Sequence, residues 1–267
     1  MNVLLCVKQV PDTARTGYCG RTETLPAGSA SSALNPMDKY ALEIAARLKD
    51  ADPEVKVTAL TLGSKLAEQA LRDCLALTAD SAYLLCDPLF EDSDSLATSY
   101  TLSVAIKALA HKEGPFDLIL CGRQAADSDE GHVGPQLAEW LGLPQVTCGL
   151  TVEREGASFK VHRETQAGTQ VVTVPTPCVV TVTKSALECR YPDILRMMES
   201  NRAEIFTLRA SDLSDLDLTQ VGRKGASTHI KKIVPPPQKT GRIRIEEESD
   251  ENSARKLYQL LNAAAIL

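Results

Sequence analysis

Short apolar runs alternate with longer amphipathic stretches through the first half of the chain. The first run, 3–7, is continuous and of strand length, which is typical of a strand buried on both faces of a parallel sheet. Similar runs recur, and each is separated from the next by a stretch with helical periodicity. The pattern predicts strands over 55–62, 81–86, 116–121 and 145–148, and helices over 38–49, 65–77, 96–112 and 133–141.

Start and stop signals agree with these helices. Pro36 stands where a first helical turn would begin, and Asp94 stands where a carboxylate can cap free amides. Gly142, with Pro144 two residues later, closes the last helix of the series. Because strands joined by helical crossovers lie parallel with one handedness, we predict an α/β fold with a doubly wound, mostly parallel, Rossmann-like sheet.

After residue 148 the pattern changes to strict alternation of apolar and polar positions. Three segments of this kind, 149–153, 158–163 and 170–174, are separated by glycine-containing turns, which predicts an antiparallel meander attached to the main sheet. A further apolar run, 179–182, is expected to be a buried strand.

The C-terminal part loses this regularity from Cys189 onward. Pro235–Pro237 predicts a stiff spacer, and 251–267 carries leucines at helical spacing. We therefore divide the chain into a nucleotide-binding α/β domain, 1–189, and a partner-recognition segment with an extended C-terminal arm, 190–267. The leucine stripe is equally consistent with docking on another protein and with folding back on its own domain.

Composition and charge exclude several classes of partner. The 29 Lys and Arg residues against 35 Asp and Glu give a net charge of −6, and aromatic residues make up only 4%, so neither nucleic acid nor an anionic membrane surface is expected as a partner. No apolar run approaches the roughly 20 residues of a membrane span, and no targeting segment is recognised, so a cytoplasmic location is expected. The eight cysteines form no C-x-x-C pair and are expected to be reduced core residues rather than metal ligands.

The loop from Gly122 to Pro135 is the best candidate for a binding site. It follows a buried strand and precedes a helix, and ligands of open α/β sheets bind beyond the carboxyl ends of the strands. Gly122 would let a ligand approach the backbone, and the amides of Val133 and Gly134 would bind a pyrophosphate. Because the loop also contains three acidic residues between 127 and 130, the residues alone favour a purely structural loop and leave a nucleotide site as the alternative.

Other strand and helix ends converge on the same crevice if the first strand is central. They are Cys6-Val7-Lys8, Leu62-Gly63, Asn35-Pro36, Ser95 and Thr98. Each is weak alone, since Asn-Pro is a common turn and Ser or Thr a common cap. The familiar catalytic motifs, such as G-x-S-x-G, H-E-x-x-H and the phosphate loop ending in Gly-Lys, are absent from the sequence.

Six ordered motifs make the chain resemble the β subunits of electron transfer flavoproteins, from residue 1 to about residue 205. They lie at 6–13, 34–43, 71–76, 94–99, 122–135 and 177–181. The resemblance implies a heterodimer with a larger α subunit that carries FAD, and an adenine nucleotide bound in the crevice of the β subunit.

Some of the motifs resemble the electron-bifurcating branch of that family. Val10-Pro11-Asp12-Thr13, 94–99 and Val133-Gly134-Pro135-Gln136 carry this resemblance. It implies that the β subunit binds a second FAD, which NADH reduces, and that electrons divide between ferredoxin or flavodoxin and the α-subunit FAD, which serves a flavin-containing dehydrogenase. The alternatives are a single-flavin carrier with a structural AMP in the β subunit and, from another class, a nucleotide-sensing regulatory domain.

The resemblance also implies which residues contact the nucleotide, with no side chain needed as a catalyst. The implied cofactor-binding residues are Cys6, Val7, Lys8, Asn35, Asp38, Leu62, Gly63, Ser95, Thr98, Gly122, Arg123, Gln124, Asp127, His132, Val133 and Gly134. For His132, a bond to a phosphate and a solvated loop position are equally open.

A segment at 190–202 corresponds to the part of the family that contacts a partner dehydrogenase. Its candidate anchors are Ile194, Leu195 and Met198. An ordinary amphipathic helix with these residues turned inward is the alternative.

Overall fold

The computed structural model describes residues 1–12, 32–232 and 243–266. These residues fall into two compact units, one that ends at Lys231 and one that begins at Lys232. The first unit contains the sheet and the cleft described below.

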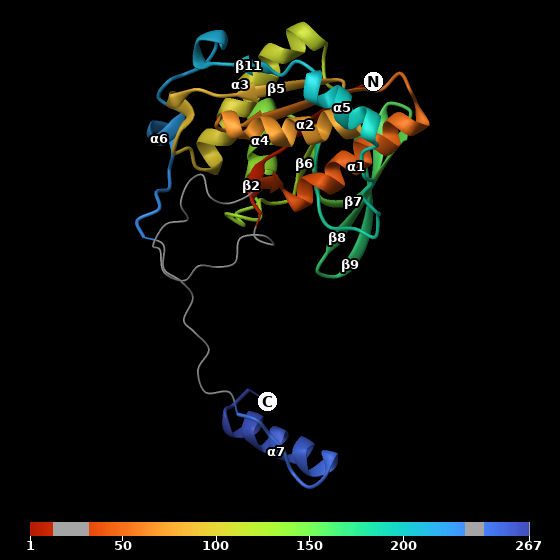
Figure 1. The fold of residues 1–267 in the computed structure, drawn as a ribbon, viewed down its shortest axis with the longest axis vertical. Helices are drawn as coiled ribbons and strands as arrows, with labels where there is room; N and C mark the ends of the chain where they lie inside the picture. The colour runs from red at the N-terminus through yellow and green to blue at the C-terminus, as the bar shows by residue number, and fades with distance from the viewer. Residues whose placement is uncertain (13–31, 233–242, 267) are drawn as a thin grey trace. The chain divides into compact units, whose positions relative to one another are not determined.

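A nine-stranded sheet forms the centre of the first unit (Figure 1). Its strands run in the order β11-β5-β4-β1-β6-β10-β7-β8-β9. The bounds are β1 Asn2–Cys6, β4 Lys56–Leu62, β5 Ser81–Leu85, β6 Leu118–Gly122, β7 Gln145–Glu155, β8 Ser158–Thr165, β9 Gly168–Pro175, β10 Cys178–Val182 and β11 Phe206–Leu208. All pairs from β11 to β7 are parallel, and β7, β8 and β9 are antiparallel. The predicted doubly wound, mostly parallel sheet with an antiparallel meander is confirmed.

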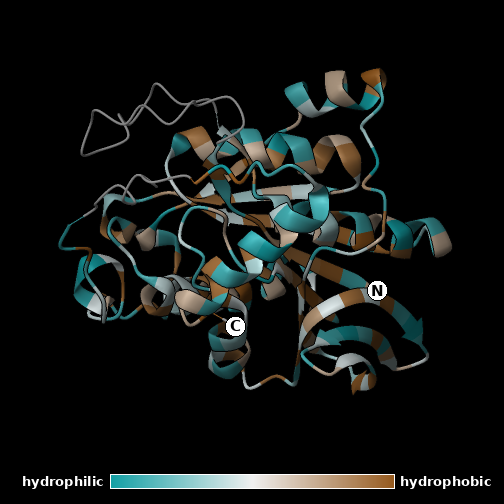
Figure 2. Cartoon of the chain, turned by 90° about the horizontal axis from the view of Figure 1, so that it is seen from below, coloured by the Kyte–Doolittle hydropathy of each residue, from teal (hydrophilic) through white to brown (hydrophobic). Residues whose placement is uncertain are grey.

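Helices cover both faces of this sheet, and side chains alternate along each strand to meet them. The helices are α1 Pro36–Ala51, α2 Glu68–Leu77, α3 Ser95–Glu113 and α4 Val133–Leu141, and 3₁₀ turns at η1 Lys65–Ala67 and η2 Pro88–Phe90 precede α2 and α3. Figure 2 shows hydrophobic residues concentrated on the strands between the helices.

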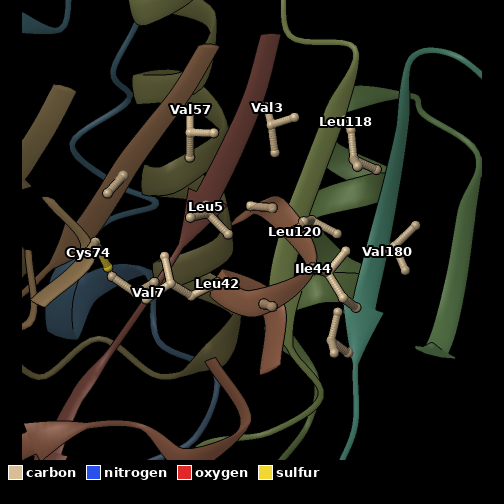
Figure 3. Packing of buried hydrophobic residues seen from close by; sticks show 14 of the residues in the cluster. Val3, Leu5, Val7, Leu42, Ile44, Val57, Cys74, Leu118, Leu120 and Val180 are labelled. Carbon is tan, nitrogen blue, oxygen red and sulfur yellow. The ribbon is translucent and has the colours of Figure 1, made fainter. Parts of the chain in front are cut away.

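The two cores lie on opposite faces of the central strand β1. Val3, Leu5 and Val7 pack in the core of α1 and α2, whereas Leu4 and Cys6 pack in that of α3 and α4. Figure 3 shows the first core, where side chains from neighbouring strands meet those of α1. Each fully buried aliphatic side chain contributes about 1.5–3 kcal/mol relative to exposure, so the continuous apolar runs explain why these strands are central.

Two segments differ from the sequence prediction near strand ends. The segments expected at 145–148 and 149–153 are one strand, β7, which bends at Cys148, where φ is 59° and the register with β10 shifts. Near the N-terminus, β2 (Gln9–Pro11) pairs with β3 (Ser32–Leu34) in a separate antiparallel sheet.

The residues after 189 contain more regular structure than their pattern predicts. They form α5 (Ile194–Arg202), the edge strand β11, the 3₁₀ turn η3 (Ala210–Asp212) and the short helix α6 (Gly222–Gly225). In β11, the ring of Phe206 stacks on Tyr83 of β5 at 5.2 Å. A strand this short shows no periodicity, so its contacts and its pairing with the distant strand β5 reveal it.

The second unit contains α7 (Asp250–Ala263), which the leucine spacing predicts. Its cap residue Ser249 accepts a hydrogen bond from the Asn252 amide at 3.2 Å. No residue of this helix is buried, and Leu257 and Tyr258 are both exposed. The predicted proline spacer, Pro235–Pro237, lies outside the described residues. In the described parts of the chain, no helix is long and apolar enough to cross a bilayer.

The close packing of α4 on the sheet generates a first prediction. A Cβ atom at Gly134 would lie 2.9 Å from Cys121 Sγ and closer still to Thr181 Cγ2. We therefore expect Gly134→Ala to lower the free energy of unfolding by about 1–3 kcal/mol, although alanine favours helices elsewhere.

Chemical denaturation of purified variants measures this effect. Thr181→Ser removes the blocking methyl group and should restore part of the stability of Gly134→Ala, while Glu139→Ala, on the exposed side of α4, should change little. An alanine variant as stable as the wild type would show that the helix can move away at no cost.

Candidate functional site

A cleft of about 700 Å³ opens at the carboxyl ends of β1, β4 and β6. Every residue predicted as cofactor-binding lines it except Gly63, whose amide instead donates to the Leu85 carbonyl at 3.0 Å. The sheet therefore brings together residues from five separate parts of the sequence. The residues that line it as predicted are Cys6, Val7, Lys8, Asn35, Asp38, Leu62, Ser95, Thr98, Gly122, Arg123, Gln124, Asp127, His132, Val133 and Gly134.

Asp38 lies at the start of α1 and is 4% exposed. Its Oδ1 accepts hydrogen bonds from the Gly122 amide and the Asn35 side-chain amide, both at 3.0 Å, and its Oδ2 accepts one from the Lys8 amide at 2.7 Å. Burial raises the pKa of the carboxyl to about 7, although these hydrogen bonds act to lower it. Asp38 thus joins the ends of β1 and β6 to the first turn of α1.

Asn35 extends this connection to the loop after β6. Its Nδ2 also donates to the Gln124 carbonyl at 2.9 Å, and its Oδ1 accepts a hydrogen bond from the Ala126 amide at 3.1 Å. Both hydrogens of the side-chain amide are therefore in use. Asn35 is 1% exposed, so these bonds fix the loop at the edge of the cleft.

Packing requires two of the three glycines that line the cleft, Gly122 and Gly134, whereas the sequence suggested ligand access as the reason for Gly122. A Cβ atom at Gly122 would lie 2.8 Å from Met37 Cβ and would overlap Asp38 Oδ1. One at Gly134 would overlap Thr181. Glycine at these positions lets α1 and α4 approach the sheet, rather than giving a ligand access to the backbone, and the Gly122 amide is already bonded to Asp38.

The first turn of α4 offers free hydrogen-bond donors to the cleft. The helix begins at Val133, and its first amides have no partner within the helix. Pro135 has no amide hydrogen, so the donors available at this end are those of Val133 and Gly134. Helix N-termini of this kind attract anions because the amides and the helix dipole both point outward.

Some acidic residues of the loop after β6 have hydrogen-bond or ion-pair partners, which bears on whether they would repel a bound anion. Asp127 Oδ1 forms an ion pair with Lys8 Nζ at 2.8 Å, across the mouth of the cleft between β1 and the loop. Asp129, with φ of 57°, bonds the Gln124 side chain. Lys8 offsets the charge of Asp127, whereas the partner of Asp129 is an uncharged amide.

Cys6 and Cys121 form an apolar wall of the cleft. They are register partners on β1 and β6, and each is 6% exposed. Burial raises the pKa of both thiols, that of Cys121 to about 12, so both are neutral at physiological pH. They offer the cleft polarizable, uncharged contact surface.

A further set of cleft residues was not found from the sequence. It comprises residues near η2 and α3 and, from beyond the predicted α/β domain, Arg223, Thr228, His229 and Ile230. The run from Gly222 to His229 carries three cationic or imidazole side chains. This cluster is the local feature of the sequence that could have indicated a ligand contact here. Its position depends on Asp94, whose Oδ2 accepts hydrogen bonds from the Ser227 and Thr228 amides.

The predicted anchors on α5 project into solvent. Ile194 is 76% exposed, Leu195 72% and Met198 50%, and Ser200 is the only buried residue of the helix. The alternative of an inward-turned apolar face is therefore wrong for this chain.

Polar bonds hold α5 on α2 from its other side. Arg72 donates to the Ser200 carbonyl at 2.6 Å, and Arg196 donates to the Leu77 carbonyl at 2.7 Å. Just before the helix, Arg190 forms an ion pair at 3.0 Å with Glu43, a buried carboxylate of α1. These bonds leave the apolar side chains free for contact with another molecule.

Fold and cleft place the chain among doubly wound α/β proteins whose ligand sites lie at the carboxyl edge of the sheet. Comparison with known proteins narrows the class. The family model of the electron transfer flavoprotein domain matches residues 27–213, and the chain belongs to this family, among its β subunits.

Several relatives are similar over nearly their whole length. The electron transfer flavoprotein subunit beta of Megasphaera elsdenii is 42% identical over 95% of this chain and 94% of its own. The acryloyl-CoA reductase electron transfer subunit gamma of Anaerotignum propionicum is 37% identical over 97% of this chain and 98% of its own. The caffeyl-CoA reductase-Etf complex subunit CarD of Acetobacterium woodii is 37% identical over 90% of each chain.

The raised pKa of Asp38 makes the stability of the fold depend on pH in a defined direction. The ordinary value is 3.8 and the value in the folded protein is about 7, so the folded state binds a proton more tightly. The stabilisation by this group is complete below about pH 4 and is lost as the pH rises through 7. Between pH 5 and pH 8 the wild type should lose about 2 kcal/mol more unfolding free energy than Asp38→Asn.

Denaturant titrations of both proteins at the two pH values measure this difference. The comparison removes the contributions of all other titrating groups, and any constant cost of the substitution cancels. Equal losses in the two proteins would mean that Asp38 stays ionised across this range.

Proposed function

We propose that this protein is the β subunit of a heterodimeric electron transfer flavoprotein that binds FAD in the cleft and takes electrons from NADH. The electrons divide between ferredoxin or flavodoxin and, through the FAD of the α subunit, a flavin-containing dehydrogenase. The observation that carries the proposal is the open cleft with free helix amides at the carboxyl edge of the sheet, in a chain of this family.

The cleft suits a dinucleotide in size and in donor chemistry. A volume of about 700 Å³ lies within the usual range of roughly 300–1,000 Å³ for enclosed cofactors. The amides of Val133 and Gly134 would hold the pyrophosphate. Cys6 and Leu62 would contact the adenosine, and Ser95 and Thr98 would lie nearer the isoalloxazine ring.

The residues of the chain position the coenzyme and set its surroundings. When bound, the flavin supplies the redox chemistry. Asp38 and Asn35 hold the loop after β6 at a fixed place, so that the α4 amides face the cleft without reorganisation. The neutral thiols and the apolar side chains exclude water from one wall. No side chain is required as a general acid or base.

The names of two relatives support a bifurcating role over the single-flavin alternative. Two similar chains are named as electron transfer subunits of acryloyl-CoA and caffeyl-CoA reductase systems. By analogy we expect a CoA-ester reductase or dehydrogenase as the partner, contacted through the exposed face of α5 at Ile194, Leu195 and Met198. The amphipathic helix α7 would dock on the α subunit as a C-terminal arm. The described cysteines are free thiols, which suits the reducing cytoplasm in which we expect the protein to act.

Counting flavins in the purified heterodimer tests the cofactor. Release by denaturation should yield two FAD and no AMP per αβ pair. Thr98→Trp, which fills the cleft from α3, should lower the count to one, while Lys107→Trp, on the exposed side of the same helix, should leave it at two. One FAD and one AMP in the wild type would replace this proposal with the single-flavin alternative.

The α5 face gives an independent test of the partner site. Leu195→Glu should slow electron transfer to the partner dehydrogenase at limiting concentrations about tenfold or more, as loss of a central interface anchor does. Flavin content should not change. Leu66→Glu, at a leucine that is 70% exposed outside α5, serves as the control, and equal effects of the two variants would place the partner elsewhere.

A further inference from the structure

One wall of the cleft is built by residues that the proposed function does not use. We call residues 223–230 the strap. Arg223, Thr228, His229 and Ile230 of the strap line the cleft on the side of α3. They belong to the same compact unit as the sheet, which ends at Lys231.

Asp94 holds the strap in place while also capping α3. Its Oδ1 accepts a hydrogen bond from the Ala97 amide at 3.0 Å, the usual bond of a helix cap. Its Oδ2 accepts three from the strap, from the Ser227 amide at 2.8 Å, the Thr228 amide at 3.0 Å and the Thr228 hydroxyl at 3.1 Å. One carboxylate therefore satisfies four donors and ties the strap to the helix that carries Ser95 and Thr98.

The beginning of the strap is also fixed by close backbone packing. Gly222 has φ of 57°, and a Cβ atom there would lie 3.1 Å from the Glu91 carbonyl oxygen and would overlap that of Leu89. The chain thus turns tightly against η2 immediately before Arg223. This geometry directs the strap along the cleft rather than away from it.

Arg223 brings a positive charge to this wall of the cleft. Lys8, another cation of the cleft, is paired with Asp127. Within the described parts of the chain, Arg223 forms no ion pair, and its side chain is exposed. Arginine binds phosphate groups through paired N–H donors, so an unpaired arginine at a cleft mouth suits a phosphate ligand.

We propose that the strap binds the pyrophosphate of the nicotinamide dinucleotide that donates electrons, with Arg223 as the contacting cation and Asp94 as the positioning residue. The inference rests on the proposed function, in which the α4 amides hold the pyrophosphate of the resident flavin. Arg223 lies instead on the α3 side, at an exposed position that a dissociating ligand can reach. Ile230, 83% exposed although it lines the cleft, would be covered by that ligand.

Binding of ADP-ribose to the flavin-loaded heterodimer tests the role of Arg223. ADP-ribose carries the pyrophosphate of NADH without the nicotinamide, so calorimetry measures the contact without any redox reaction. Arg223→Gln should raise the Kd about tenfold, the effect of losing one charge-assisted contact, and should leave two FAD per αβ pair. Lys224→Gln, the adjacent cation that does not line the cleft, should stay within twofold of the wild type.

The Asp94→Asn variant distinguishes the effect of Asp94 on the position of the strap from the effect of its negative charge on ligand binding. Asparagine caps helices as well as aspartate does, but its side-chain NH₂ cannot accept the strap donors. Removing a negative charge from the cleft would by itself strengthen binding of an anion, whereas the loss of the strap should weaken binding of ADP-ribose several-fold. Trypsin should also cleave at Arg223 and Lys224 faster than in the wild type. Asp92→Asn, at a neighbouring carboxylate that lines the cleft, should produce neither change.

The outcomes distinguish this inference from the proposed function. If Arg223→Gln matches Lys224→Gln while both retain two FAD and bind ADP-ribose, the strap role is overturned and the proposed function stands. If Arg223→Gln loses one FAD, the arginine holds the resident flavin and the inference is wrong. A wild-type heterodimer that contains AMP and binds no ADP-ribose would overturn both.

Discussion

A single buried carboxylate determines the geometry of the cleft. Asp38 accepts hydrogen bonds from the Lys8 amide after β1, the Gly122 amide at the end of β6 and the Asn35 side chain before α1. The three segments lie in different parts of the sequence, and this one carboxylate bonds to all of them. Since each bond replaces a contact with water at a buried position, losing the acceptor would leave several donors unsatisfied.

In this arrangement, backbone amides and the side chains at the mouth of the cleft are the groups that remain to contact a ligand. The carboxylate and amide side chains at the base of the loop are occupied within the protein, whereas among the described residues the Val133 and Gly134 amides have no hydrogen-bond acceptor. A site built in this way can hold a phosphate group without burying a cation of its own. Cationic side chains lie at the mouth, where Lys8 is paired and, among the described residues, Arg123 and Arg223 are not. The α4 amides suit a coenzyme that stays bound, and the cations at the mouth suit a second ligand that dissociates.

The sequence predicts the central fold well because the relevant signals are local. Continuous apolar runs mark β1, β4, β5 and β6, and the central position of β1 then brings the predicted site residues to one edge. The edge strand β11 escaped prediction because three residues carry no period, and its stacking partner Tyr83 is far away in the chain.

The roles of individual side chains were harder to predict. Gly122 was expected to admit a ligand, and Gly134 only to offer its amide. The structure shows that a Cβ atom at Gly122 would overlap α1 and that one at Gly134 would overlap the sheet, and a sequence pattern does not show which face of a glycine is crowded. The strap was not predicted because its contacts are not local. The sequence around Asp94 predicts a helix cap, but it does not show that the second carboxylate oxygen of Asp94 accepts hydrogen bonds from residues more than a hundred positions away.

A structure of the purified heterodimer with its nucleotides tests the central claim most directly. The account predicts flavin density in the cleft at the carboxyl ends of β1, β4 and β6, with pyrophosphate oxygens within hydrogen-bond distance of the Val133 and Gly134 amides. A cleft without a dinucleotide, or a flavin whose phosphates lie away from α4, would contradict it.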